Sequence, residues 1–140
     1  MHELIARHRV EFSDTDAGGV VHFSRFFVFM ENAEDEFLRA AGGGFTQTVG
    51  GRPGGWPKVA ASCQYLSPAR FGDTLEIHLR VARKTSRTLT YEYSIRRGGK
   101  ELARGSTTSV CCVQRPEGGF EAVPLPADLD ARIQEAPELR

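Results

Sequence analysis

The chain has 140 residues, a length that fits one domain with a single hydrophobic core. Its 18 Lys and Arg residues balance its 18 Asp and Glu residues, so the formal net charge is zero. General binding to nucleic acid or to an anionic membrane relies on a basic excess, so the composition argues against both as partners. We therefore expect a single domain over residues 1–140 with one kind of site.

The longest apolar stretch, residues 20–30, is interrupted by His22, Ser24 and Arg25. The sequence therefore predicts neither a membrane span nor a secretory signal, and we expect a cytoplasmic protein. The three cysteines show neither the pattern of a disulfide framework nor the spacing of metal ligands. We expect no metal ion and no cofactor.

The first two predicted elements are a strand over residues 5–12 and an amphipathic helix over residues 24–41. In the helix, apolar residues recur at steps of three and four, which places them on one face. These residues are Phe26, Met30, Ala33, Phe37 and Ala41. Ser24 is the predicted N-cap, and Gly42 is expected to end the helix in a left-handed conformation. Glu34, Asp35 and Arg39 are expected to face water.

The rest of the core is predicted to consist of strands. Residues 74–81 and 89–96 alternate apolar and polar side chains, and the Gly98-Gly99 pair predicts a tight turn into a returning strand over residues 100–114. A further strand is predicted over residues 59–66. Short connections favour antiparallel neighbours, and a single apolar helix face needs one sheet face to cover it. We predict an α+β fold in which a curved antiparallel sheet wraps one long helix.

Two segments fall outside this predicted core. The glycine-rich residues 42–55 are expected to form a surface loop, since they follow a helix and lack the Lys-Ser or Lys-Thr pair of a phosphate-binding loop. Residues 125–140, which include Pro126 and Pro137, are expected to form a loose C-terminal tail.

The best candidate for a site is the segment between the first strand and the helix, residues 12–23. Asp14 is explained by a capping or turn-forming role. Asp16 precedes Ser24 by eight residues, too many for direct capping, and Gly18-Gly19 lets a ligand approach the backbone. The free N–H groups at the start of the helix can stabilise developing negative charge. A carboxylate and such donors suffice for acyl transfer to water.

These residues also carry a family resemblance. Residues 14–21, with the sequence Asp-Thr-Asp-Ala-Gly-Gly-Val-Val, resemble the signature of the 4-hydroxybenzoyl-CoA thioesterase family of hotdog proteins. The likeness continues through Met-Glu-Asn-Ala at residues 30–33, Trp-Pro-Lys-Val at residues 56–59 and the segment 65–73, and it extends to about Val113. It therefore covers most of the chain.

The resemblance implies a hotdog fold and an acyl-CoA thioesterase that forms a homodimer or a homotetramer. It implies that Asp16 is the catalytic carboxylate, acting as nucleophile or as general base toward water. It also implies that the main-chain N–H near Phe23 polarises the thioester carbonyl, with Gly19 admitting the substrate. Family members commonly have tyrosine or histidine near that position, where this chain has His22 followed by Phe23.

The sequence allows two roles for each of two further residues, His22 and Glu31. His22 either orients substrate and assists proton transfer, or it packs against or caps the helix. Glu31, two helical turns after Ser24, either points into the site or is a solvated residue at the edge of the helix. The basic candidates for the coenzyme A phosphates are Lys58, Arg70, Arg83, Lys84 and Arg87.

Two alternative functions stay open. A hotdog hydratase or dehydratase would pair a histidine with a carboxylate, for which His22 near Asp16 is the candidate pair. A hotdog protein that only binds acyl-CoA would need no catalytic group. Release of free thiol from acyl-CoA, compared with hydration of an enoyl-CoA, separates these functions from thioester hydrolysis.

Overall fold

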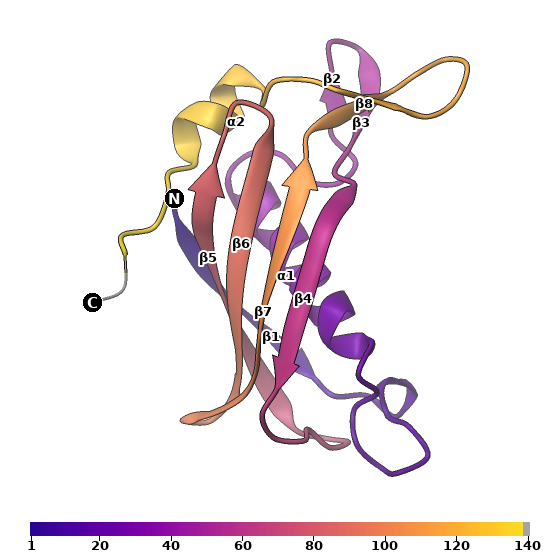
Figure 1. Ribbon diagram of the computed structural model, residues 1–140, viewed down its shortest axis with the longest axis vertical. Helices are drawn as coiled ribbons and strands as arrows, with labels where there is room; N and C mark the ends of the chain where they lie inside the picture. Colours follow the sequence, from indigo (N-terminus) through magenta and orange to yellow (C-terminus); the bar gives the residue numbers. More distant parts are fainter. Residues whose placement is uncertain (139–140) are drawn as a thin grey trace.

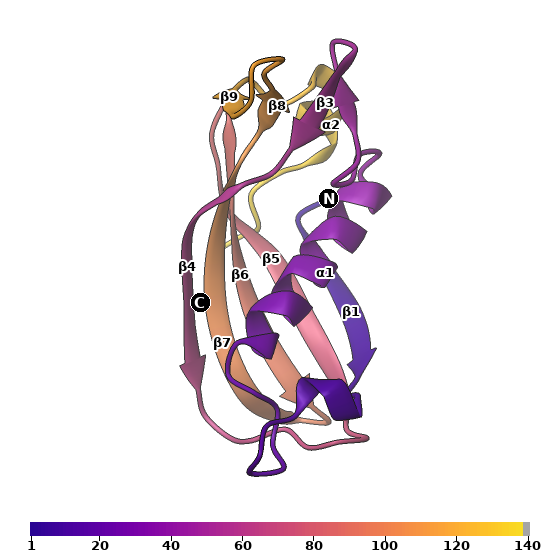
Figure 2. The same ribbon diagram turned by 90° about the vertical axis from the view of Figure 1, so that its right-hand side faces the viewer.

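Five strands form the main antiparallel sheet in the computed structural model, which describes residues 1–138 (Figure 1). The order across this sheet is β1-β5-β6-β7-β4. The bounds are β1 Glu3–Arg9, β4 Lys58–Tyr65, β5 Thr74–Lys84, β6 Thr88–Arg97 and β7 Lys100–Val110. The sheet curves around helix α1, Arg25–Ala40 (Figure 2). The predicted α+β arrangement, a curved antiparallel sheet around one long helix, is confirmed.

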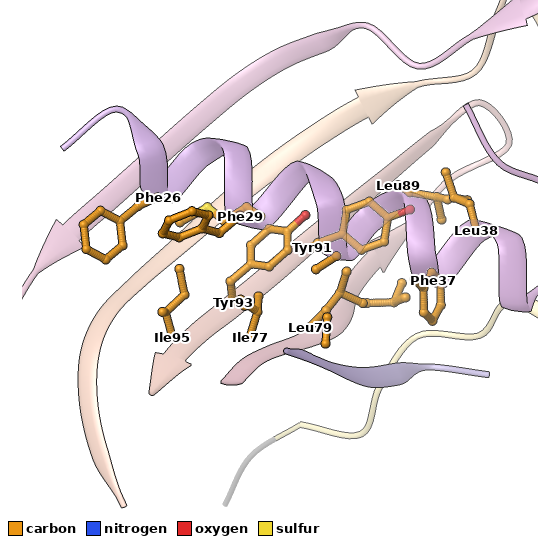
Figure 3. Close-up of a cluster of buried hydrophobic side chains, with 14 of the residues drawn as sticks. Phe26, Phe29, Phe37, Leu38, Ile77, Leu79, Leu89, Tyr91, Tyr93 and Ile95 are labelled. Carbon is orange, nitrogen blue, oxygen red and sulfur yellow. The ribbon is translucent and has the colours of Figure 1, made fainter. Parts of the chain in front are cut away.

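The core lies between α1 and the concave face of the sheet. Figure 3 shows Phe26, Phe29 and Phe37 of α1 packed over side chains from β5 and β6, among them Leu79 and Tyr91. All five are buried, as the three-and-four spacing of the helix and the two-residue period of the strands predict. The alternation of each strand therefore decides which side chains meet the helix.

Both predicted ends of α1 can be compared with the structure. Gly42 has φ +100°, and the Gly43 N–H donates to the Leu38 carbonyl at 2.7 Å, so the glycine ends the helix as predicted. The prediction of Ser24 as N-cap is wrong. Ser24 has a helical backbone and makes no side-chain capping bond, because its hydroxyl lies 2.8 Å from His22 Nδ1 instead.

The expectation that Glu34 faces water is also wrong. Its side chain is fully buried, since α1 turns this position toward β4 and β7, where Lys58 and Ser109 contact the carboxylate. Asp35 and Arg39 do form an ion pair near the surface, 2.8 Å apart. The polar side of the helix is thus narrower than the sequence pattern suggests.

The glycine-rich residues 42–55 are not a plain loop, which corrects the prediction. They contain β2, Thr48–Val49, and β3, Arg52–Gly55, joined by Gly50 and Gly51 with φ of +58° and +77°. The returning strand divides at Cys111, so that β8, Cys112–Gln114, leaves the main sheet and pairs with β3. With β9, Phe120–Ala122, these strands form a small sheet in the order β2-β3-β8-β9.

The C-terminal segment is docked and not loose, as far as the structure describes it. Residues 127–132 form helix α2, Ala127–Arg132, and Leu125, Leu129 and Ile133 are buried. Lys84 fixes this helix by donating to the Ile133 carbonyl at 2.8 Å and pairing with Asp130 at 2.9 Å. Apolar side chains four residues apart explain the docking, and residues 139–140 of the predicted tail lie outside the described residues.

Neither helix, within residues 1–138, is both long and apolar enough to cross a membrane.

The close approach of α1 to β7 depends on Gly105. A Cβ at this position would lie 2.7 Å from the Ser62 carbonyl oxygen and would also contact the Met30 side chain. We expect Gly105→Ala to lower the free energy of unfolding by about 1–3 kcal/mol through overpacking, as measured by urea denaturation. Gly99→Ala is the control, because nothing lies within 4 Å of the position that a Cβ would take at Gly99. Equal stability of the two variants would contradict this account.

Candidate active site

The loop between β1 and α1 is anchored by Asp14, whose side chain is 1% exposed. Its Oδ2 accepts a hydrogen bond from the Glu11 N–H at 2.9 Å and lies 2.8 Å from His8 Nε2. Its Oδ1 lies 2.9 Å from Arg25 Nε and 2.8 Å from Arg25 Nη2. One carboxylate therefore joins the strand, the 3₁₀ turn Phe12–Asp14 and the first residue of the helix.

The surroundings of Asp14 keep it ionised. Burial raises the pKa of this carboxyl group, but the hydrogen bonds from His8, Glu11 and Arg25 together outweigh burial and hold the pKa below its usual value. The Asp14 carbonyl also accepts from the His22 N–H at 2.8 Å. Asp14 is thus fully occupied in holding the loop against both neighbouring elements.

Asp16 is held differently, in a tight turn that leaves its side chain exposed. Its Oδ1 accepts from the Gly18 N–H at 2.8 Å, and its main-chain N–H donates to the Val20 carbonyl at 2.8 Å. Gly19 has φ +80° and donates to the Asp16 carbonyl at 3.0 Å. Among the described residues, nothing donates a hydrogen bond to Oδ2. The turn thereby fixes one carboxylate oxygen and presents the other.

The start of α1 supplies the hydrogen-bond donor. The Phe23 carbonyl accepts from the Tyr65 hydroxyl at 2.8 Å, and the Tyr65 ring packs edge-on against Phe26 with centroids 5.3 Å apart. Within residues 1–138, the Phe23 N–H makes no hydrogen bond. This N–H lies at the positive end of the helix dipole, where negative charge is stabilised.

Asp16 and Phe23 border the same open pocket, which has a volume of about 390 Å³. The other residues that line it are Val20, Val21, Phe26, Tyr65, Leu66, Ser67 and Pro68. The wall is thus mostly apolar, and it includes the acidic residue Asp16 and Phe23, whose main-chain N–H is free among the described residues. Such a pocket can hold an acyl group while a carbonyl carbon faces the carboxylate.

Comparison with known proteins identifies the family. Residues 18–104 match the family model of the thioesterase superfamily, which covers more than half of the chain. The chain belongs to the thioesterase superfamily.

Individual members of this superfamily show the same likeness. The chain is 34% identical to a putative esterase of Aquifex aeolicus over 106 residues, 74% of this chain and 80% of the relative. It is 30% identical to the acyl-CoA thioesterase YbgC of Haemophilus influenzae over 125 residues, 88% of each. The structure of a 1,4-dihydroxy-2-naphthoyl-CoA thioesterase from Synechocystis superposes with a TM-score of 0.81 and 26% identity, covering 93% of this chain and 94% of that one. The expected hotdog thioesterase fold is confirmed.

The structure brings Asp16 and Phe23 of this superfamily member together, but it does not bring His22 to Asp16. His22 Nδ1 accepts from the Ser24 N–H at 3.2 Å, and its ring stacks on Phe23 with centroids 4.6 Å apart. The histidine therefore caps the first turn that Ser24 was expected to cap. Glycine is favoured at position 19 by its positive φ and not by lack of space, because nothing lies within 4 Å of the position that a Cβ would take.

Glu31 does not line the pocket of its own chain. It is half exposed, and its Oε2 lies 3.6 Å from Lys58 Nζ, beside the buried Glu34. Of the basic candidates, Arg70 adjoins the site through a β-bridge with Val20. Arg83, Lys84 and Arg87 lie around the β5–β6 turn, at the other end of the sheet from the Asp16 loop (Figure 2).

Two residues of the site were not singled out from the sequence. Tyr65 holds the Phe23 carbonyl, and Arg25 binds Asp14. Neither contact follows a local pattern, because the partners lie 42 and 11 residues away along the chain. The available signals were the place of Tyr65 near the end of a predicted strand and its place in the segment 65–73 that carries the family resemblance.

The anchoring role of Asp14 predicts a pH-dependent stability. Asp14→Asn removes the charge that joins His8 and Arg25, and we expect it to lower the free energy of unfolding by about 3 kcal/mol at pH 7. Because the folded pKa lies below the usual value of 3.8, the carboxylate stabilises the fold above that value and stops doing so as pH falls through the folded pKa. The difference between variant and wild type should therefore narrow in acid.

Urea denaturation at neutral pH and near pH 3 measures this difference. Asp128→Asn, which changes an exposed carboxylate of α2, is the matched control. A difference between Asp14→Asn and wild type that stays constant across this range would contradict the ionised anchor.

Proposed function

We propose that the chain hydrolyses acyl-CoA thioesters to the free acid and coenzyme A, with Asp16 as the catalytic carboxylate. The observation that carries this proposal is the shared pocket of Asp16 and the unbonded Phe23 N–H. Membership of the superfamily supports it, as does the likeness to an acyl-CoA thioesterase and to hydrolases of 1,4-dihydroxy-2-naphthoyl-CoA.

In the proposed reaction the thioester carbonyl oxygen accepts a hydrogen bond from the Phe23 N–H. This bond and the helix dipole stabilise the oxyanion as the carbonyl carbon is attacked. Along one route Asp16 attacks directly, the C–S bond breaks, the thiolate leaves, and water then hydrolyses the acyl-aspartyl anhydride. Along the other, Asp16 takes a proton from water as the water oxygen attacks the carbonyl carbon, the C–S bond then breaks, and the thiolate of coenzyme A leaves. Both routes use only water and groups of the protein, so no cofactor is needed.

The two routes differ in a covalent intermediate. Rapid acid quenching of a single turnover, followed by mass spectrometry of the peptide that contains Asp16, detects an acyl-aspartyl adduct only along the nucleophilic route.

The alternatives receive less support from the geometry. A hydratase that pairs His22 with Asp16 would need the imidazole to face the carboxylate, whereas His22 Nδ1 faces Ser24. A protein that only binds acyl-CoA would not require a free carboxylate beside a free N–H. Thiol release from a panel of acyl-CoA esters, run beside hydration of an enoyl-CoA, decides between these functions.

The first test of the mechanism is Asp16→Asn. The amide keeps the shape of the side chain but can neither attack a carbonyl carbon nor accept a proton from water. We expect kcat to fall by roughly two to four orders of magnitude while the melting temperature stays close to that of wild type. Asp14→Asn should lose much less turnover at a temperature where it remains folded. An active Asp16→Asn enzyme would remove this residue from the mechanism.

We further propose that the chain forms a homodimer, or a homotetramer of two such dimers, in which two β4 strands pair. Strand β4 is bonded to β7 on one side and forms an edge of the sheet. Val59, Tyr65 and Leu66, in and beside this strand, are 65%, 46% and 50% exposed. Pairing with a second copy would cover this apolar edge and continue the sheet.

Charge at the centre of β4 tests this assembly. Light scattering should give a mass of at least twice 15.4 kDa for the wild type at micromolar concentration. Ser62→Lys would place like charges opposite each other across the two-fold axis, so we expect its mass to shift toward that of one chain. Ser86→Lys, at an exposed turn distant from β4, is the control. A monomeric wild type would contradict the proposed pairing.

We also propose a cytoplasmic location. Cys63, Cys111 and Cys112 are free thiols, which suits a reducing compartment.

A further inference from the structure

The main sheet has a second face, here called the outer face, which is turned away from α1. Figure 1 shows this face toward the viewer, with the helix behind the strands. An open hollow of about 1030 Å³ lies on it, across β5, β6 and β7. The charged residues that line the hollow are Glu3, Glu76, Glu92 and Glu101 against Arg80, Arg96 and Arg104. Because acids and bases nearly balance, the hollow does not favour a strongly charged small ligand.

Four charged side chains at the centre of the outer face alternate in sign both along and across the strands. Glu76 and Arg80 lie four residues apart on β5, and Glu92 and Arg96 do so on β6, so all four point to the same side. The register of the two strands places Glu76 opposite Arg96 and Arg80 opposite Glu92. We call these four residues the charge quartet.

The register within the charge quartet is regular. The shift between β5 and β6 falls after Val81, outside the quartet, and the shift at Ile95 concerns the pairing of β6 with β7. Arg80 Nη1 lies 2.8 Å from Glu92 Oε2, and the Arg80 guanidinium also donates to the Pro137 carbonyl. The charges are therefore held in fixed places on the face.

This alternation makes the charge quartet complementary to itself. Two outer faces can pack together around a two-fold axis that lies in their plane. If the axis runs across the strands, Arg80 meets the partner's Glu76, and Glu92 meets the partner's Arg96. If it runs along the strands, Glu76 meets the partner's Arg96, and Arg80 meets the partner's Glu92. Opposite charges meet in both cases, which favours the contact.

The exposed side of α1 lacks this property. Glu31 and Glu36 are exposed there, and Asp35 pairs with Arg39. A two-fold contact through the helix would therefore bring mostly carboxylates together, which is unfavourable. Of the two broad faces of the molecule, only the outer face of the sheet can receive a second copy without repulsion.

The outer face is also large enough for a stable contact. Strands about 4.8 Å apart that rise about 3.3 Å per residue give the five strands an area of roughly 700 Å². Stable interfaces bury about 800 Å² per partner. Exposed ion pairs such as Arg80 with Glu92 contribute little to the stability of a single chain, so stability alone does not explain the alternation.

We infer that the outer face binds the outer face of a second copy of this chain through the charge quartet. The contact joins two sheets face to face, whereas the proposed β4 pairing joins them edge to edge. The two contacts together would assemble a homotetramer from two dimers. The face-to-face contact depends neither on thioester hydrolysis nor on the β4 pairing.

Charge reversal tests this contact. Glu76→Lys with Glu92→Lys makes the quartet wholly positive, and Arg80→Glu with Arg96→Glu makes it wholly negative. Each variant alone should show half the wild-type mass in light scattering at micromolar concentration, because like charges then meet across the contact. An equimolar mixture of the two variants should regain the wild-type mass, and native mass spectrometry should find them in equal number in that assembly. The like charges within each sheet persist in the mixture, so only contact between copies can explain the recovery.

A matched control carries the same change in charge elsewhere. Glu117→Lys with Asp128→Lys alters two exposed residues outside the outer face and should keep the wild-type mass. Melting temperatures show whether the reversed variants fold. If one does not, Glu92→Lys alone replaces it, since this side chain is half exposed, and should raise the concentration at which the assembly dissociates by about tenfold or more.

Three results would overturn the inference. These are a wild type of one chain, a reversed variant that keeps the wild-type mass, and a mixture that does not regain it. If Ser62→Lys lowers the mass and the reversed variants do not, the β4 pairing stands and the face-to-face contact fails. Thiol release from acyl-CoA tests the proposed function separately from all of these.

Discussion

The arrangement of the site depends on the carboxylate of Asp14. This one group binds a histidine of β1, a main-chain N–H of the following turn and the arginine that begins α1. Without it the ten residues between Asp14 and Arg25 would connect two elements with no fixed separation. Because Asp14 is fixed, the turn that follows it is fixed as well. Asp16 and Phe23 therefore stay at one pocket, although neither is buried in the core. An ion pair that is costly to bury thus serves here to position other groups.

A division of labour between two nearby carboxylates follows from their surroundings. Asp14 has both oxygens bonded and is enclosed, whereas Asp16 lines the pocket and, among the described residues, has hydrogen bonds to Oδ1 alone, from its own turn. A group with all its lone pairs occupied is poorly suited to chemistry, because any reaction would first break the bonds that hold the loop. The same residue type therefore serves as an anchor at one position and is the proposed reactive group two residues later.

Much of this could be predicted from the sequence where the signal is local and periodic. The helix, the main strands and the turn at Gly98 follow from spacing, and Asp16 stood out because no cap could explain it. Glu34 was misplaced because helical spacing gives the direction of a side chain but not how far the sheet curls around it. Strands β2 and β3 were not predicted because the segment is rich in glycine, and α2 was not predicted because Pro126 precedes it. Both residue types usually occur in loops. The contact of Tyr65 with Phe23 joins distant segments, so only the folded chain reveals it.

Residues 100–114 are interrupted at Cys111, so that β7 belongs to the main sheet and β8 to the small one. Strand β7 is bonded along its length between β6 and β4, whereas the small sheet beyond it consists of strands of two to four residues. The small sheet joins the core at the Cys111 backbone, which bonds to Arg87 and Val123, and through the buried side chains of Cys112 and Val113. Such a sheet can open by itself while the helix and the main strands stay folded, so the molecule is expected to unfold locally at this end before it unfolds as a whole. Amide hydrogens of β2, β3 and β9 would accordingly exchange with solvent sooner than those of β6.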